Sequence, residues 1–492
     1  MADYDLAIIG GGLNGVSLAR DAAGRGLRVV VLEQGDLGAG ASSTGSPLIQ
    51  GDLHDLEQGR LRRLRGVLAE RDLWLRNAPH LVRPAHFVVP MQAEARPPWL
   101  WRLGLLAHDR LARGRRLPVT DTIDLTHHLL GDALKRPFGL AVGYWGGIAD
   151  GARLTVLTAV DAAARGAVVL TGAKCVRADR SDIWRLVVIN RGQRQIVTAR
   201  TLANATGGWA VSVAETVLRL PPPRVRLIQS SQIVVRRLFD HDGVYVLQNP
   251  DRRLVHAAPF GRDLMLIGTV ERAFAGDPAM VAVPSQDAAY LRDAANRYFR
   301  DQLGPSDDVH TLAAVNVMPV HAGRFGAPRD ALVRLERKFG EAPLLTTLGG
   351  TSTTARRQAE AAMVALAPFF AMPGPWTARE PLAGGDLPSG DLETYVEASR
   401  RRWPFLARDA ISRMAGAYGT RIEQILDAAQ TMGDLGPELG EGLTGAEVRY
   451  LMRQEWARFA DDVLWRRSRL RLTLSARDRG ELALFMNAQA SC

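Results

Sequence analysis

The sequence predicts an α/β fold in which a Rossmann-like domain is interleaved with an α+β domain and followed by an all-α C-terminal domain. Three observations predict it: a glycine-rich turn between two buried strands near the N-terminus, two later strands that also end in glycine, and helical patterns beyond residue 381. The chain has 492 residues, which is enough for two or three domains of ordinary size.

The composition is that of a water-soluble globular protein. Apolar residues make up 47% of the chain and charged residues 23%. The longest apolar runs, such as residues 6–9 and 29–32, are strand-sized, and the N-terminus lacks the features of a signal peptide. Two cysteines, Cys175 and Cys492, exclude a disulfide scaffold and a cysteine-only zinc site. We therefore expect a cytoplasmic protein.

The net charge of +10 does not by itself indicate a nucleic-acid partner. Only three of the 62 basic residues are lysines, and the arginines are scattered along the chain, so we expect no nucleic acid to bind. A basic, amphipathic stretch at residues 99–116 leaves two alternatives open. It forms either a peripheral helix on the inner face of the plasma membrane or a helix packed on its own domain.

The first 33 residues have the pattern of a β-turn-α-β unit. Residues 6–9 are an apolar run typical of a buried parallel strand, and residues 10–15 read Gly-Gly-Gly-Leu-Asn-Gly. A helical pattern covers residues 16–25, and residues 28–32 form a second apolar strand. A G-x-G-x-x-G turn in this context is the dinucleotide-binding fingerprint.

Each glycine of this turn has its own role. Gly10 permits the tight turn, Gly12 lets the backbone approach a pyrophosphate, and Gly15 lets the helix and the strand pack closely. The N–H groups at the start of the helix favour phosphate binding. Glu33, 18 positions after Gly15, can accept hydrogen bonds from a ribose diol. The sequence therefore predicts a dinucleotide site rather than a purely structural turn.

Later glycine-containing segments favour FAD over NAD as this dinucleotide. Residues 38–46 form a small, hydroxyl-rich loop, which either lines the dinucleotide or is only a flexible connection. Strands at residues 201–205 and 344–348 each run into a glycine turn, and a helix begins near Thr353. Segments this far apart suit an interleaved FAD domain better than a compact NAD module.

Short, distinctive sequence blocks occur over nearly the whole chain. The blocks are Ile9-Gly10-Gly11-Gly12-Leu13-Asn14-Gly15, Asp21-Ala22-Ala23-Gly24-Arg25-Gly26-Leu27, Leu68-Ala69-Glu70-Arg71 with Ala78-Pro79-His80-Leu81, Asp150-Gly151-Ala152-Arg153-Leu154, Asn204-Ala205-Thr206-Gly207, Leu247-Gln248-Asn249, Ile267-Gly268-Thr269 with Gly276-Asp277-Pro278, and Ala460-Asp461-Asp462-Val463-Leu464-Trp465-Arg466-Arg467. The order and spacing of these blocks are more specific than the dinucleotide turn alone, and they resemble the FAD-dependent (respiratory) glycerol-3-phosphate dehydrogenase family.

The resemblance implies non-covalently bound FAD, hydride transfer from a secondary alcohol carbon to flavin N5, and a quinone-type electron acceptor. We expect an FAD-binding domain of residues 1–80, 145–220 and 315–375, a substrate domain of residues 81–144 and 221–314, and a helical C-terminal domain of residues 381–492. The expected cofactor-binding residues are Gly10, Gly12, Leu13, Asn14, Gly15, Glu33, Gln34, Ser42, Ser43, Ala205, Thr206, Gly207, Gly349, Gly350, Thr351, Ser352 and Thr353.

The substrate-binding positions depart from the pattern of this family. After the Ser-Ser loop the family has a lysine, a histidine, an arginine and a tyrosine. The corresponding residues here are Pro47, Gln50, His54 and Asp55.

Further along the chain, four more family residues are replaced. An arginine becomes Met318, a lysine becomes Thr351, another lysine becomes Gln229, and a candidate catalytic base becomes Gln232. Each charge-assisted hydrogen bond to a phosphate is worth about 1.5–3 kcal/mol, so losing three cations costs roughly three decades of affinity. Arg334 matches an arginine near the substrate, and together with His54 it is the expected catalytic pair.

Two hypotheses follow for the function. In the first, the protein is an FAD-dependent dehydrogenase of a small alcohol or polyol, whose native substrate carries no phosphate if the lost cations are not replaced. In the second, it is a catalytically silent FAD-binding protein with a partner-binding or regulatory role. The oligomeric state is left open, with a homodimer as one arrangement.

Overall fold

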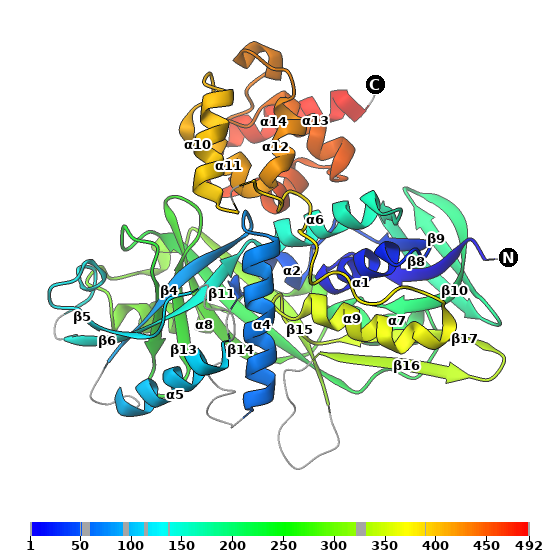
Figure 1. Cartoon of the computed structure of the whole chain (residues 1–492), viewed down its shortest axis with the longest axis horizontal. Helices are drawn as coiled ribbons and strands as arrows, with labels where there is room; N and C mark the ends of the chain where they lie inside the picture. The colour runs from blue at the N-terminus through cyan, green and yellow to red at the C-terminus, as the bar shows by residue number, and fades with distance from the viewer. Residues whose placement is uncertain are drawn as a thin grey trace.

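A computed structural model describes residues 2–49, 51, 60–91, 98–112, 117–135, 138–320, 331–388 and 390–490. These residues form two large β-sheets with helices packed on them, and a separate group of helices that contains the C-terminus (Figure 1). The predicted fold class, mixed α/β with an all-α C-terminal domain, is confirmed.

The first sheet is built around the N-terminal β-turn-α-β unit. Its central strands are parallel and their side chains are almost all buried, because helices cover them as in other doubly wound sheets. The helices of this layer are α1 (Leu13–Gly24), α6 (Gly151–Ala164) and α9 (Ala355–Leu366), with α7 (Ala210–Thr216) beyond β10. Across the sheet the strands are β16 (Leu332–Lys338), β17 (Glu341–Leu348), β10 (Gln193–Asn204), β1 (Tyr4–Ile9), β2 (Val29–Glu33) and β7 (Val168–Thr171), while β9 (Trp184–Asn190) joins β10 and β8 (Ala173–Arg180) joins β9.

The second sheet is larger and, apart from one parallel pair of strands, antiparallel. Helix α8 (Ser285–Asn296) covers one face of this sheet, and its residues Leu291 and Ala294 pack on Ile233 and Ile267. Helices α4 (Leu61–Asn77) and α5 (Pro98–Leu111) contact its other end. Across the sheet the strands are β15 (His310–Pro319), β11 (Val225–Arg236), β14 (Leu264–Phe274), β13 (Leu254–Pro259), β12 (Val244–Gln248), β4 (Val82–Pro90), β6 (Leu140–Ala149) and β3 (Leu48–Ile49), with β5 (Asp121–Asp124) beside β6.

The strand pairing divides the chain differently from the expected domain boundaries. β15 pairs with β11 along its whole length, so it belongs to the second sheet, although the expected FAD-binding range begins at residue 315. β6 likewise pairs with β4 up to Ala149, beyond the expected boundary at residue 145. The long hydrogen-bonded ladders decide this division, and the sequence pattern does not reveal which strand pairs with which.

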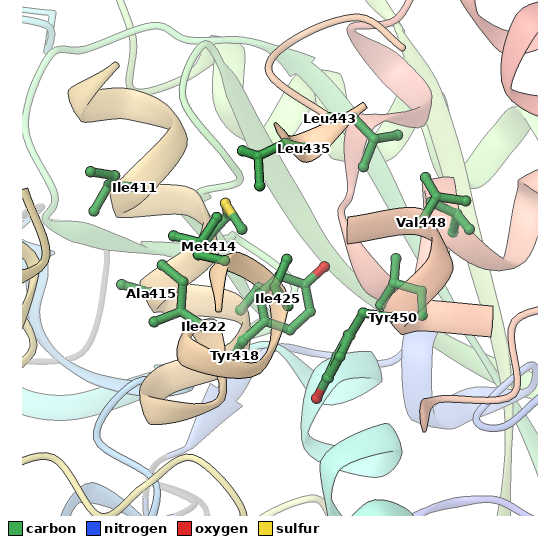
Figure 2. Packing of buried hydrophobic residues seen from close by; sticks show 14 of the residues in the cluster. Ile411, Met414, Ala415, Tyr418, Ile422, Ile425, Leu435, Leu443, Val448 and Tyr450 are labelled. Carbon is green, nitrogen blue, oxygen red and sulfur yellow. The ribbon is translucent and has the colours of Figure 1, made fainter. Parts of the chain in front are cut away.

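The C-terminal domain has its own hydrophobic core, in which Met414, Tyr418, Ile422, Ile425 and Tyr450 pack together (Figure 2). The sequence predicts helices here at residues 392–402, 407–418, 421–431 and 444–460. The first two match the observed helices within one residue, the other two are longer than the observed helices, and the sequence predicts no counterpart of the last helix. The domain contains α10 (Leu392–Arg402), α11 (Arg408–Tyr418), α12 (Ile422–Leu426), α13 (Gly445–Gln454), a π-helical turn (Asp462–Arg467) and α14 (Ala476–Ala490).

Candidate functional site

A cavity of about 1440 Å³ is lined by residues of both sheets. The glycine turns of the first sheet form one wall, and one face of the second sheet forms another. Most small-molecule sites have volumes of about 300–1,000 Å³. This cavity therefore has room for a dinucleotide and for a second small molecule.

The N-terminal glycine turn forms the wall at the point where β1 passes into α1. Gly10 has a φ of +111°, and a Cβ atom there would lie 2.6 Å from the backbone oxygen of Ala205. A Cβ atom at Gly15 would lie 2.0 Å from the backbone oxygen of Gly10. Because neither position admits a side chain, α1 packs closely on the ends of β1 and β10. Its first residues, Leu13 and Asn14, then line the cavity where a pyrophosphate can approach the helix start.

Glu33 ends β2 at the same edge of the sheet. Its Oε2 atom accepts a hydrogen bond from the Gly11 N–H at 2.7 Å, and its Oε1 atom accepts one from the Gly35 N–H at 2.8 Å. Burial raises the pKa of the Glu33 carboxyl group, against the opposite effect of these two bonds. The carboxylate is thus held in place with acceptor capacity left for a ribose diol.

We expect FAD to dissociate on acidification because of Glu33. Ribose hydroxyl groups that donate to Glu33 stabilise its charged form, so FAD binding lowers the pKa of this carboxyl group. The affinity for FAD is therefore complete above the pKa of the empty site and falls as the pH drops through that value. Glu33→Gln should weaken FAD binding about tenfold and remove this pH dependence. Titration of apoprotein with FAD between about pH 5 and 8, followed by flavin fluorescence, measures both effects.

The control for this prediction is Glu393→Gln, which changes an exposed carboxyl group of the C-terminal domain. It should leave both the affinity and its pH dependence unchanged. The same pH dependence in Glu33→Gln as in the unaltered protein would contradict the role given to Glu33.

Two hydrogen bonds join the separate segments that the sequence assigned to the cofactor. The Leu13 N–H donates to Ser42 Oγ at 3.0 Å, and Asn14 Nδ2 donates to the Gly349 oxygen at 3.1 Å. Gly15 lies beneath the turn, and Ser43 lies in the short helix α2 (Ala41–Thr44); neither is part of the cavity wall. The predicted cofactor residues that line the cavity are Gly10, Gly12, Leu13, Asn14, Glu33, Gln34, Ser42, Ala205, Thr206, Gly207, Gly349, Gly350, Thr351, Ser352 and Thr353.

The second sheet presents polar side chains from four neighbouring strands to the cavity. They are Asn316 on β15, Ser230 on β11, Glu271 on β14 and His256 on β13. Asn316 Nδ2 donates a hydrogen bond to Ser230 Oγ at 2.8 Å. A wall that offers amide, hydroxyl, carboxyl and imidazole groups suits a substrate with several hydroxyl groups.

The replaced family positions take different places around this cavity. Met318 and Thr351 line it, and neither carries a charge. Gln229 and Gln232 are not part of the wall: Gln229 Nε2 donates to the Ala282 oxygen at 2.7 Å, and Gln232 Nε2 donates to the Thr44 oxygen at 2.8 Å. Gln232 therefore holds the end of α2 beside the cavity.

The expected catalytic pair is not brought together by the described residues. His54, with Gln50 and Asp55, lies outside them. Arg334 lies on β16, and 54% of its side chain is exposed. Its Nη2 atom lies 3.8 Å from Glu336 Oε1, and the residue is not part of the cavity wall. The cavity thus provides no support for a role of Arg334 near the substrate.

The described part of the cavity wall contains four basic residues that the sequence did not single out: Lys174, Arg252, Arg253 and His256. Lys174 lies on β8, whereas the other three belong to the hairpin of β12 and β13. The sequence feature that could have pointed to this part of the wall is the pair Arg252-Arg253, which lies just after the Leu247-Gln248-Asn249 block. Arginines are so numerous in this chain that such a pair does not stand out.

Cys175 also lines the cavity, but burial raises the pKa of its thiol to about 12. The thiol is therefore protonated at neutral pH and is a poor nucleophile. Among the described residues there is no group of three or more side chains placed to hold a metal ion.

Comparison with known proteins gives two family matches that together span most of the chain. Residues 5–353 match the family described as FAD dependent oxidoreductase, and residues 375–484 match the C-terminal domain of alpha-glycerophosphate oxidase. The chain is 40% identical to a glycerol-3-phosphate dehydrogenase of Pseudomonas aeruginosa, over 99% of this chain and 95% of that protein. It is 37% identical to D-erythritol 1-phosphate dehydrogenase of Brucella abortus, over 96% of each.

The fold also matches a crystal structure of glycerol-3-phosphate dehydrogenase from Bacillus halodurans complexed with FAD. The TM-score is 0.77 at 21% sequence identity, and the match covers 99% of this chain and 91% of that one. The glycine turns, the hydrogen-bonded Glu33 carboxylate and the cavity volume described above are also suited to binding FAD.

Proposed function

Because the chain belongs to the family of FAD-dependent glycerol-3-phosphate dehydrogenases, and is an FAD-dependent oxidoreductase, we propose that it oxidises a secondary alcohol of a polyol phosphate. The observation that carries this proposal is the cavity itself. One wall is formed by the glycine turns that can hold a dinucleotide, and another wall is a face of the second sheet with hydrogen-bonding side chains. Bound FAD supplies the hydride acceptor.

The chain's own residues bind and orient the alcohol. The Ser230–Asn316 pair offers a hydroxyl and an amide oxygen to substrate hydroxyl groups, and the two strands that carry it hold it rigidly. Thr269 and Glu271, on the adjacent strand, extend this row. Such contacts favour a polyol over a simple alcohol.

The alcohol proton needs an acceptor, and we assign this role to His256. The related family has a histidine at the position of Gln232. Gln232, Gly268 and His256 lie in one row across β11, β14 and β13, and a Cβ atom at Gly268 would lie 2.5 Å from Gln232 Cγ. Since Gly268 has no side chain, nothing on the middle strand separates Gln232 from His256, and only His256 of these three residues lines the cavity.

His256→Gln should therefore lower the rate of flavin reduction about 100-fold and abolish the decline in rate at low pH that protonation of an imidazole causes. Stopped-flow reduction of bound flavin across the pH range measures both. The control is Glu271→Gln, the other proton acceptor on this wall. If Glu271→Gln loses the pH dependence and His256→Gln keeps it, the carboxylate is the base instead.

The phosphate group would bind at Arg252 and Arg253, which replace the cations missing at Met318 and Thr351. Both arginines belong to the hairpin that also brings Leu254 and His256 to the wall. A guanidinium group binds a phosphate through two parallel hydrogen bonds, which a single lysine does not match. The uncharged Met318 and Thr351 favour a second candidate, a polyol substrate without phosphate.

Matched pairs of compounds test the proposal: glycerol with glycerol 3-phosphate, and erythritol with its 1-phosphate. Bleaching of the oxidised flavin spectrum is followed anaerobically for each. A phosphate ester that reduces the flavin at least 100-fold more efficiently than its parent polyol supports the proposal. Arg253→Gln should then raise the KM for the ester more than that for the polyol. Equal efficiencies would favour the unphosphorylated substrate, and no bleaching of firmly bound FAD would favour the silent flavoprotein.

We propose that helix α5 brings the protein to a membrane surface, where the quinone-type acceptor is found. Trp99, Leu103 and Leu106 recur at helical spacing and are 65%, 60% and 56% exposed. Trp101 and Leu105, on another side of the same helix, line the cavity. α5 thus connects an exposed apolar stripe with the site of oxidation. Among the described residues, no helix is both long and apolar enough to cross a membrane.

Replacing Trp99, Leu103 and Leu106 together by serine should reduce binding to anionic phospholipid vesicles at least tenfold, because the apolar stripe is lost. Electron transfer to a quinone in these vesicles should fall in parallel, while transfer to a soluble dye stays unchanged. Vesicle sedimentation and the two acceptor assays measure this. Met280→Ser, which removes an exposed apolar side chain elsewhere, is the control. Unchanged vesicle binding would exclude α5 as the membrane contact.

A further inference from the structure

The loop between β2 and the rest of the cofactor cradle is held from outside by the C-terminal domain. Glu33 at the end of β2 and the first loop residues, Gln34 and Gly35, line the cavity, and the Gly38 N–H donates to the Gly11 oxygen of the glycine turn at 3.1 Å. Asp36 lies in the middle of the loop with only 8% of its surface exposed, and it does not line the cavity. Its carboxylate instead meets two arginines of the C-terminal domain.

The three residues form what we call the Asp36 cluster: Asp36, Arg466 and Arg467. Arg467 Nη2 lies 2.7 Å from Asp36 Oδ1, and Arg467 Nη1 and Arg466 Nε both donate to Asp36 Oδ2. The Arg467 side chain is fully buried, and that of Arg466 is 16% exposed. One loop carboxylate therefore contacts two guanidinium groups in a nearly dry environment.

The two arginines are also fixed on the side of their own domain. Arg467 Nη2 donates to the Glu455 backbone oxygen at 2.6 Å, and Arg466 Nη2 donates to Asp462 Oδ1 at 2.6 Å. Asp462 in turn accepts hydrogen bonds from two backbone N–H groups, those of Arg458 and Phe459. The guanidinium groups are thus held by contacts within their own domain as well as by Asp36.

From this arrangement we infer that the C-terminal domain holds the loop of residues 33–38 in the conformation that binds FAD. Arg466 and Arg467 are positioning residues for the cofactor, although neither touches the cavity. Glu33 must keep its carboxylate towards the ribose, and Asp36, three residues further on, anchors the other end of the same turn. This inference rests on FAD binding and is independent of the substrate proposed above.

A contact that only docks one domain on another would behave differently. It would destabilise the protein with and without FAD to the same extent. A contact that positions the loop changes FAD affinity in particular, because releasing Asp36 lets the loop sample conformations that FAD does not bind. The two explanations are therefore separable by measuring stability and cofactor affinity on the same variants.

The experiment compares Asp36→Asn and Arg466→Gln with a matched control in the full-length chain. The control is Arg413→Gln, because Arg413 makes a similar pair with buried Glu447, at 2.6 and 2.7 Å, entirely within the C-terminal domain. Dissociation constants for FAD come from titration of apoprotein with FAD. Melting temperatures are measured with and without the cofactor.

Asp36→Asn and Arg466→Gln should raise the Kd for FAD at least tenfold and shrink the increase in melting temperature that FAD produces. Arg413→Gln should lower both melting temperatures and leave the Kd within about twofold. If Asp36→Asn does not fold, Arg466→Lys is compared with the Arg413→Gln control in the same measurements of Kd and melting temperature. This variant keeps the positive charge at the partly exposed position. An FAD affinity in the Asp36 cluster variants equal to that of the control would overturn the inference.

Discussion

Gly15→Ala is expected to yield a protein without FAD. The new methyl group would lie 2.0 Å from the backbone oxygen of Gly10, and a main-chain atom in a tight turn cannot rotate away as a side chain can. Helix α1 must move off β1, which separates its N-terminus from the place where the pyrophosphate lies. We expect FAD affinity to fall at least 100-fold, as seen in the ratio of flavin to protein absorbance after purification and in FAD titration.

The control for this substitution is Gly416→Ala. Gly416 lies in helix α11 of the C-terminal domain, and a Cβ atom there would meet nothing within 4 Å. Because alanine favours a helix more than glycine does, this variant should bind FAD normally and be slightly more stable. Purification of Gly15→Ala as a yellow protein with unchanged affinity would show that α1 can retreat without disturbing the cofactor.

The cofactor half of the molecule could be predicted from sequence because its signals are local. A strand, a G-x-G-x-x-G turn, a helix and Glu33 lie within 33 residues, and each constrains the next through chain geometry. The later turns at Thr206 and Gly349 were harder to place, since only the parallel pairing of β1, β10 and β17 brings them to one edge. The expected interleaved topology supplied that pairing.

The substrate half could not be predicted in the same way. Which side of a strand faces a cavity depends on pairing and bulges, so Gln229 and Gln232 looked like substrate residues and instead bind backbone oxygens. His256 belongs to the wall only because β13 lies beside β14. The contact of Asp36 with Arg466 spans 430 residues, and no local pattern announces a partner that far away.

The largest effect on stability is expected at a buried ion pair between Arg153 of α6 and Glu455. Like the Asp36 cluster, this pair joins the domain of the first sheet to the C-terminal domain. Arg153 Nη2 lies 2.9 Å from Glu455 Oε1, the two residues are 1% and 0% exposed, and Arg153 Nε donates to the Ala417 oxygen at 2.9 Å. Proximity to Glu455 raises the pKa of Arg153 in spite of its burial. Glu455→Gln leaves this guanidinium charge without a carboxylate in a dry interior, which costs about 3–5 kcal/mol.

Glu455→Gln should therefore unfold at a clearly lower urea concentration than the unaltered holoenzyme, as followed by tryptophan fluorescence. The double variant Arg153→Met with Glu455→Leu tests the cause, because it removes both charges and keeps apolar volume in their place. It should recover most of the free energy of unfolding that Glu455→Gln loses. A buried ion pair is about as stabilising as apolar residues of similar size, whereas a single buried charge without a partner is strongly destabilising. If the double variant is as unstable as Glu455→Gln, removing the unpaired charge of Arg153 does not restore stability, and the defect comes from the other surroundings of Glu455, such as Arg467 Nε, which lies 4.0 Å from Glu455 Oε2.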